Sequence, residues 1–140
     1  MIVLASDHGG YELKQELKLY FSKHKIEYID VGALTYDAND DYPDIINCAV
    51  KHVLKDKSNY GIFICGMGVG VSMVANRHKG IRAALCQDTQ TARMARMHNN
   101  ANVLCLGARN ICKRRATNII NTFLNTEFLG GKHQRRIDKF

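Results

Sequence analysis

Residues 60–72 read YGIFICGMGVGVS and join a short apolar run to a glycine-rich loop. Ile62, Phe63 and Ile64 predict a buried strand that ends at Cys65, and glycine then occupies every second position. Glycines let the backbone approach a ligand closely, and the helix expected next offers unpaired N–H groups to an anion. A thiol near a helix N-terminus is stabilised as the thiolate. The stretch therefore predicts a phosphorylated small molecule bound beside a reactive sulfur.

Outside this stretch, short apolar runs alternate with amphipathic segments. Further strands are expected at 2–6, 26–31, 81–86 and 102–107, and helices at about 11–21, 43–54, 69–78, 88–98 and 110–124. Gly130 and Gly131 then break the chain before a short basic tail, 130–140. Five strands alternating with five helices predict an α/β fold, with a parallel sheet that carries helices on both faces.

The composition is that of one globular domain covering residues 1–140, with 46% hydrophobic and 24% charged residues. No apolar run approaches the roughly 20 residues needed to span a bilayer, and the first ten residues lack the pattern of a signal peptide. We therefore expect a cytoplasmic protein with no membrane partner. The remaining cysteines (48, 86, 105 and 112) form no CxxC pair and are expected to be free thiols that mostly pack in the core.

The net charge of +7 raises the question of nucleic-acid binding, and much of the excess lies between Lys113 and Lys139. The basic cluster lacks interleaved aromatic residues and any nucleic-acid motif, and it fits an anionic small ligand at least as well. A nucleic-acid-binding module therefore remains a distant alternative.

Polar residues follow the predicted strands at the edge where parallel α/β sheets bind ligands. Asp7 and His8 follow the first strand, Cys65 the third and Arg109 the fifth. His98 precedes the fifth strand and should lie at the opposite pole of the sheet. It could join the same chemistry only if a neighbouring subunit supplied it.

The glycine loop matches neither common nucleotide signature. The phosphate-loop pattern GxxxxGK[ST] is absent, and Val71 breaks the spacing of the dinucleotide fingerprint GxGxxG. No set of histidines and cysteines has the spacing of metal ligands. We expect neither a cofactor nor a metal.

Six separated blocks occur in an order that identifies a family. They are Asp7 to Tyr11, Asp41 to Pro43, the CGMGVGVS loop, NRHKGIRA at 76–83, HNNANVLCLGAR at 98–109 and the GGKHQRR tail. With them the chain resembles, nearly end to end, the ribose-5-phosphate isomerase B and galactose-6-phosphate isomerase family. The resemblance implies a Rossmann-like three-layer αβα sandwich and metal-free aldose-ketose isomerisation of a phosphorylated sugar. It also implies a homodimer or dimer of dimers with active sites between subunits.

The resemblance also implies a role for each matching residue. Cys65 matches the base that moves a proton between C1 and C2, and His98, from the partner subunit, matches the residue that helps to open the sugar ring. Substrate contacts are implied for Asp7, His8, Tyr42, Gly66, Met67, Gly68, Gly70, Ser72, Asn99, Arg109, Lys132 and Arg136, with the loop amides serving the enediolate oxygen and His8, Arg109, Lys132 and Arg136 the phosphate.

Two positions depart from the family pattern. Met67 replaces a threonine whose hydroxyl assists ring opening, and Lys132 replaces an arginine, which removes bidentate phosphate recognition. Neither change removes the base. The expected reaction interconverts ribose 5-phosphate and ribulose 5-phosphate, and the alternative substrate is a six-carbon aldose 6-phosphate such as allose or galactose 6-phosphate.

Overall fold

A five-stranded, all-parallel sheet forms the centre of the computed structural model, which describes residues 1–140. The strands are β1 (Ile2–Ser6), β2 (Tyr28–Gly32), β3 (Tyr60–Cys65), β4 (Ala83–Leu85) and β5 (Val103–Gly107). They lie in the order β2-β1-β3-β5-β4, so the strand order reverses between β1 and β3. The parallel α/β fold predicted from the alternating pattern is confirmed.

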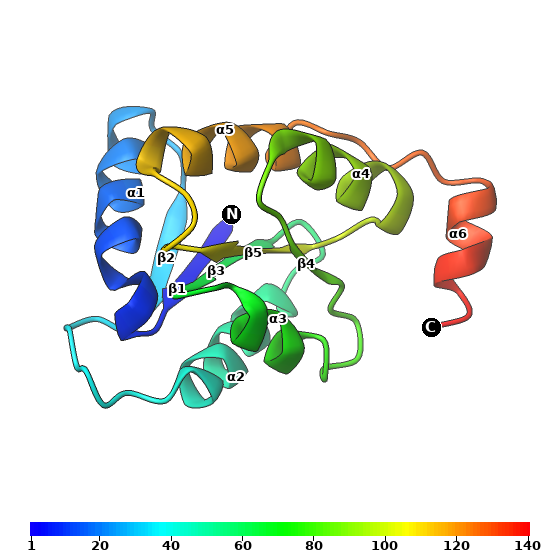
Figure 1. The fold of residues 1–140 in the computed structure, drawn as a ribbon. Helices are drawn as coiled ribbons and strands as arrows, with labels where there is room; N and C mark the ends of the chain where they lie inside the picture. Colours follow the sequence, from blue (N-terminus) through cyan, green and yellow to red (C-terminus); the bar gives the residue numbers. More distant parts are fainter.

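Helices cover both faces of this sheet (Figure 1). They are a 3-10 turn η1 (His8–Gly10) and the α-helices α1 (Tyr11–Lys23), α2 (Tyr42–Val53), α3 (Val69–Ala75), α4 (Thr89–Asn99), α5 (Lys113–Leu124) and α6 (Lys132–Ile137). Helices α1, α4 and α5 lie on one face, α2 and α3 lie on the other, and α6 stands apart beyond the end of α4. The three layers are those of a Rossmann-like sandwich.

The two-residue period of the central strands divides the core between the two faces. Ile62 and Ile64 of β3 pack with α1 and α5 on one side. Phe63 and Cys65 pack with α2 and α3 on the other. Because both faces are covered, β1 and β5 are buried along their whole length, which explains their unbroken apolar sequences.

Some element bounds differ from the prediction. Strand β4 is only three residues long, and α3 ends at Ala75 instead of residue 78. Helix α5 begins after Cys112 and not after Asn110, whereas Asp88 caps α4 as expected, its carboxylate accepting the Thr91 N–H at 2.7 Å. The basic tail folds into α6. None of the helices has the length and apolar character that crossing a membrane requires.

A buried lysine fixes the start of the loop 33–41, which borders the candidate site. The side chain of Lys14 is fully buried, and its Nζ donates to Asp30 Oδ1 at 2.6 Å and to the carbonyl of Ala33 at 2.5 Å. Lys18 pairs with the other oxygen of Asp30 at 2.8 Å. A buried charge is tolerated only when it is paired and hydrogen-bonded, so this network holds the chain where it leaves β2.

Candidate active site

The carboxyl ends of β1, β3 and β5 bring three predicted residues to one edge of the sheet. Ser6 is aligned with Ile64, and Cys65 with Gly107. Asp7, Cys65 and Arg109 therefore leave neighbouring strands at the same level. This is the point where the strand order reverses, which is where ligands bind in open α/β sheets.

The thiol of Cys65 accepts a backbone hydrogen bond from the glycine loop. The N–H of Gly68 donates to Sγ at 3.1 Å, and Cys65 is buried. Gly68 has a φ of 77°, and a Cβ on it would lie 2.5 Å from Leu85 Cδ1. Only glycine meets both conditions. The loop thus turns back toward the sulfur and presents a backbone donor to it.

Three further contacts place the neighbours of the loop. A Cβ on Gly70 would lie 2.7 Å from the ring of Tyr42, so that ring covers the start of α3. A Cβ on Gly66 would lie 3.1 Å from Arg109 Nε, so the guanidinium lies against the loop. The Arg109 N–H also donates to the Gly66 carbonyl at 3.0 Å.

Asp7 and His8 form a cluster with Asp40, a residue that the sequence analysis did not select. Asp40 Oδ1 accepts from the backbone N–H of His8 at 3.0 Å and lies 2.6 Å from His8 Nδ1. Asp7 Oδ1 accepts the N–H of Gly10 at 3.1 Å and caps η1. Asp40 lies in the irregular segment between β2 and α2, and no periodicity in the sequence shows which of the acids there folds back.

These contacts shift two pKa values upward for different reasons. Burial raises the pKa of the Asp7 carboxyl, against the opposing effects of the Gly10 N–H and of His8. The hydrogen bond to Asp40 raises the pKa of His8, with further help from the charge of Asp7, while the Arg109 guanidinium acts in the opposite direction. The cluster therefore offers an imidazole and a carboxyl group that both hold their protons more tightly than usual.

Ligand atoms of Asp7, His8 and Asp40 lie within 4.8 Å of one another, a spacing that a metal ion could also use. The internal contacts compete with such use, because His8 Nδ1 already lies 2.6 Å from Asp40 and Asp7 Oδ1 already accepts a backbone N–H. A cation would have to displace the imidazole from its carboxylate. The donor set fits an ion pair better than a metal centre.

A second cluster of predicted residues lies at the opposite pole of the sheet. His98, near the end of α4, stacks on His133 of α6 with ring centroids 4.3 Å apart and an interplanar angle of 10°. Burial lowers the pKa of His133, and the charges of His98, Lys132 and Arg136 act in the same direction. We call His98, Asn99, Lys132 and Arg136 the α4–α6 cluster. It is separated from Cys65 of its own chain by the length of β5.

Ser72 is the remaining predicted contact, and its hydroxyl is used within α3. It donates to the carbonyl of Val69 at 2.7 Å. Met67 is 46% exposed, and its sulfur lies 3.7 Å from the amide nitrogen of Asn110. The departure from the family pattern therefore lies at the open surface of the loop.

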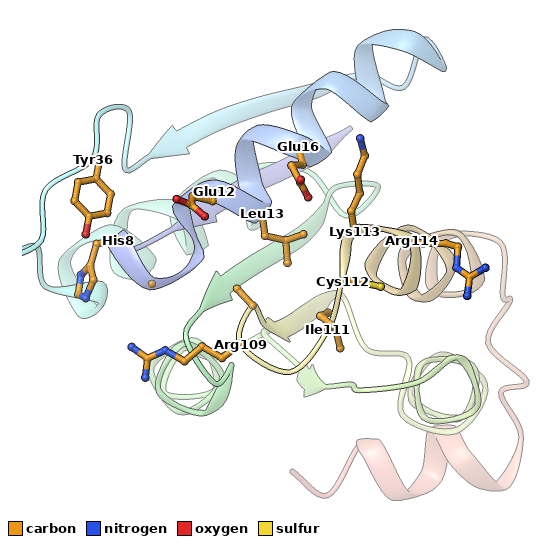
Figure 2. A pocket seen from close by; sticks show the side chains of 12 residues that line it. His8, Glu12, Leu13, Glu16, Tyr36, Arg109, Ile111, Cys112, Lys113 and Arg114 are labelled. Atoms are coloured by element: carbon orange, nitrogen blue, oxygen red, sulfur yellow. The ribbon is translucent and has the colours of Figure 1, made fainter.

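A pocket of about 760 Å³ opens between α1 and the segment that leads into α5. Figure 2 shows His8, Tyr36 and Arg109 at one end, with Cys112, Lys113 and Arg114 at the other. Cys65 does not line it. The pocket therefore reaches His8 and Arg109 at the edge of the sheet but not the thiol of Cys65.

The other cysteines are only partly the core residues that were expected. Cys86 and Cys105 are buried, but Cys48 and Cys112 are exposed. Burial raises the pKa of Cys86 to about 12. Cys112 precedes the first turn of α5, where the N–H groups of Arg115 and Arg114 lower the pKa of its thiol. Cys65 is therefore not alone in having a helix-start setting.

The fold is that of an α/β protein in which a thiol, Cys65, and two basic side chains, His8 and Arg109, lie at the edge of the sheet where the strand order reverses. The chain belongs to the Ribose/Galactose Isomerase family, whose sequence profile matches residues 2–140. It is 45% identical over 139 residues to a probable ribose-5-phosphate isomerase B of Mycoplasma genitalium, covering 99% of this chain and 91% of the relative. It is 41% identical to ribose-5-phosphate isomerase B of Mycobacterium tuberculosis, covering 98% and 85% of the two chains.

Solved structures agree with the sequence relatives. Ribose 5-phosphate isomerase of Thermotoga maritima superposes with a TM-score of 0.94 at 46% identity, covering 99% of this chain and 94% of the other. Ribose-5-phosphate isomerase B from Mycoplasma genitalium with bound ribulose-5-phosphate superposes with a TM-score of 0.93 at 45% identity, covering 99% and 91%. The Rossmann-like fold expected from the resemblance is therefore confirmed.

Proposed function

We propose that this protein is an isomerase that interconverts ribose 5-phosphate and ribulose 5-phosphate. The observation that carries the proposal is the Cys65 thiol, which receives the Gly68 N–H at 3.1 Å on the same edge of the sheet as the basic side chains that follow β1 and β5, His8 and Arg109. The relative that binds ribulose-5-phosphate shares 45% of its residues with this chain, which supports the same substrate class. Aldose-ketose isomerisation needs a base for a weakly acidic C–H and donors for the oxygen that gains charge.

Cys65 acts as the base in this proposal. Its thiolate takes the proton from C2 of the open-chain aldose, the electron pair of that C–H bond forms the C1–C2 double bond, and O1 becomes an oxyanion. Backbone amides around Gly66, Met67 and Gly70 donate to that oxygen. The hydroxyl proton on O2 then passes to O1, and return of the Cys65 proton to C1 leaves a carbonyl at C2 and a hydroxyl at C1, which is the ketose.

The phosphate group is held away from the reacting carbons. His8 and Arg109 approach it from the edge of the sheet that carries Cys65. Lys132 and Arg136 approach it from the α4–α6 cluster of a partner subunit. Binding energy gained at the phosphate can then orient the sugar against the thiol.

We infer a site shared between two subunits, because the two clusters lie at opposite poles of the sheet within one chain. Strand β5 has five residues and separates the poles by about 17 Å at 3.3 Å per residue. A two-fold dimer brings the α4–α6 cluster of each chain to the Cys65 edge of the other. Tyr42, Met67, Val69 and Met73 are exposed around that edge and supply apolar surface for such a contact.

Ring opening precedes proton transfer. In this proposal His98 of the partner subunit and Asp7 assist ring opening, and burial raises the pKa of the Asp7 carboxyl, which favours its protonated form. Met67 has no proton to give. Ring opening therefore rests on fewer groups than in relatives with a threonine at this position.

The decisive experiment is a turnover panel of five-carbon aldose 5-phosphates and six-carbon aldose 6-phosphates with wild type and Cys65→Ala. We expect ribose 5-phosphate to be the best substrate, and the variant to lose turnover while still binding it. Substantial residual turnover by the variant would contradict the role of Cys65. Faster turnover of allose or galactose 6-phosphate would favour the six-carbon alternative, which the family description and the exposed Met67 permit.

A further inference from the structure

One contact in the cluster of Asp7, His8 and Asp40 takes no part in proton transfer or ring opening. Asp40, from the loop 33–41, places a single oxygen, Oδ1, against two nitrogens of His8, the backbone nitrogen and ring Nδ1. The backbone N–H lies at 3.0 Å and ring Nδ1 at 2.6 Å. Two bonds to one oxygen fix both the main chain and the ring, so the imidazole keeps one orientation. Nε2 is then the ring nitrogen left free for a ligand.

The protonation state of that free nitrogen decides what it can bind. In a neutral ring whose Nδ1–H donates to Asp40, Nε2 is an acceptor and repels phosphate oxygens. In the imidazolium, Nε2–H is a donor and carries charge. A carboxylate 2.6 Å from Nδ1 favours the second form.

The groups that face His8 explain why a carboxylate is needed to favour the protonated form of its ring. Arg109 approaches from the segment after β5, and its charge opposes protonation of His8. Asp7 and Asp40 act in favour of it. Two cations that converge on one phosphate repel each other, and a carboxylate behind one of them offsets that repulsion.

The carboxylate of Asp40 lies in a largely buried position. Its side chain is 12% exposed, and Oδ2 is buried with no hydrogen-bond partner. A buried carboxylate oxygen without a hydrogen-bond partner, close to Asp7, is costly unless an opposite charge lies beside it. The cationic ring of His8 compensates for the charge of Asp40.

We propose that Asp40 is a positioning residue of the sugar-phosphate site, which holds His8 as an imidazolium with its Nε2–H aimed at the phosphate group. The inference rests on the proposed function, which places His8 at the phosphate. Lys14 supports the same loop from its other end through the carbonyl of Ala33.

The test compares Asp40→Asn with wild type and with Asp37→Asn. Asp37 is an exposed acid of the same loop that accepts only the Asn39 N–H, a bond that asparagine can also accept, so the control removes the same charge. At about pH 8 we expect Asp40→Asn to raise KM for ribose 5-phosphate about tenfold, with kcat changed by less than about threefold. At about pH 6 the KM defect should shrink, because the ring is protonated in the variant as well.

A defect in KM that is equal at both pH values, or a loss confined to kcat, would overturn the proposal. So would an equal effect of Asp37→Asn. Binding of inorganic phosphate, measured by calorimetry at both pH values, separates this failure from failure of the proposed function. A wild type without isomerase activity would refute the function, yet pH-dependent loss of phosphate binding in Asp40→Asn would still support the role of Asp40. If Asp40→Asn does not fold, Asp40→Ser supplies the same comparison, and a folded variant that binds phosphate like wild type at pH 8 overturns the role.

Discussion

The rings of His98 and His133 lie face to face, 4.3 Å between centroids and 10° from parallel, and this stack joins α6 to the end of α4. A second link is the N–H of Leu129, which donates to the carbonyl of Met97 at 3.1 Å. The tail is therefore a fixed part of the domain. Its basic face moves with His98, and the four residues of the α4–α6 cluster form one unit.

Acid should weaken this unit. Burial and the charges of His98, Lys132 and Arg136 lower the pKa of His133 below its ordinary value of 6.5. When the pKa of a histidine is lower in the folded than in the unfolded protein, its contribution to stability is fully present above the unfolded-state pKa. That contribution is lost as the pH falls through the folded-state pKa. We expect the Cε1–H resonance of His133 to titrate below 6.5 in an NMR experiment. In His98→Phe, which keeps an aromatic ring but removes the charge, the midpoint should rise, and a His133 midpoint above 6.5 in wild type would refute the account.

The glycine loop offers a test of backbone conformation. Gly68→Ala should lower the free energy of unfolding by about 2–4 kcal/mol, because it combines a left-handed residue with overpacking against strand β5. The added Cβ would lie 2.9 Å from the carbonyl carbon of Leu106, which is main chain and cannot yield. Gly130→Ala is the matched control, since φ there is 64° and no atom lies within 4 Å. Urea unfolding should show a loss of about 1 kcal/mol for that control, and equal losses at both sites would contradict the role of the Leu106 contact.

The sequence predicted the sheet and its edge residues for a clear physical reason. Both faces of the sheet are covered, so strands such as β1 and β5 appear as unbroken apolar runs, and the residues after them converge on one edge. Asp7, Cys65 and Arg109 could be placed in this way without any structure. His98 could be placed at the other pole by the same logic.

Other features lay outside that logic. The contact between Asp40 and His8 joins residues 32 positions apart through an irregular loop, and no periodicity encodes it. Helix α6 has six residues and depends on its docking against α4, since so short a helix is unstable alone. The position of Cys112 at the start of α5 was not predicted, because Asn110 is the better capping residue by type. In the structure the cap is Cys112, two residues after Asn110.

The position of Cys112 at the start of α5 predicts that the cysteines differ in their rate of alkylation. Iodoacetamide at neutral pH should alkylate exposed Cys112 several-fold faster than exposed Cys48, because the N–H groups of Arg115 and Arg114 lower the pKa of the Cys112 thiol. Cys86, with a pKa raised to about 12, should stay unmodified. Peptide mass spectrometry over time measures all three.

Activity followed in the same samples separates Cys112 from Cys65. Cys112 lies at the end of the pocket opposite His8 and Arg109 (Figure 2), so its alkylation should leave the enzyme active. Activity should be lost later, when Cys65 is alkylated. Ribose 5-phosphate should protect Cys65 and leave the Cys112 rate unchanged. Cys112→Ser should remove the fast labelling phase, and labelling of Cys86 before Cys112 would contradict the predicted order.

The proposed division of the site between two subunits can be tested by mixing inactive variants. Cys65→Ala lacks the base, and His98→Ala lacks the group from the α4–α6 cluster, so each homodimer should be nearly inactive. A mixed dimer has one site with both changes and one site with neither. Random mixing after partial unfolding should therefore restore about a quarter of wild-type turnover, since half of the dimers are mixed and each has one intact site. Mixing Cys65→Ala with Cys65→Ser controls for refolding and should restore nothing. If the first mixture also stayed inactive while both chains refolded, the two clusters would not meet across an interface, and His98 would have to act elsewhere.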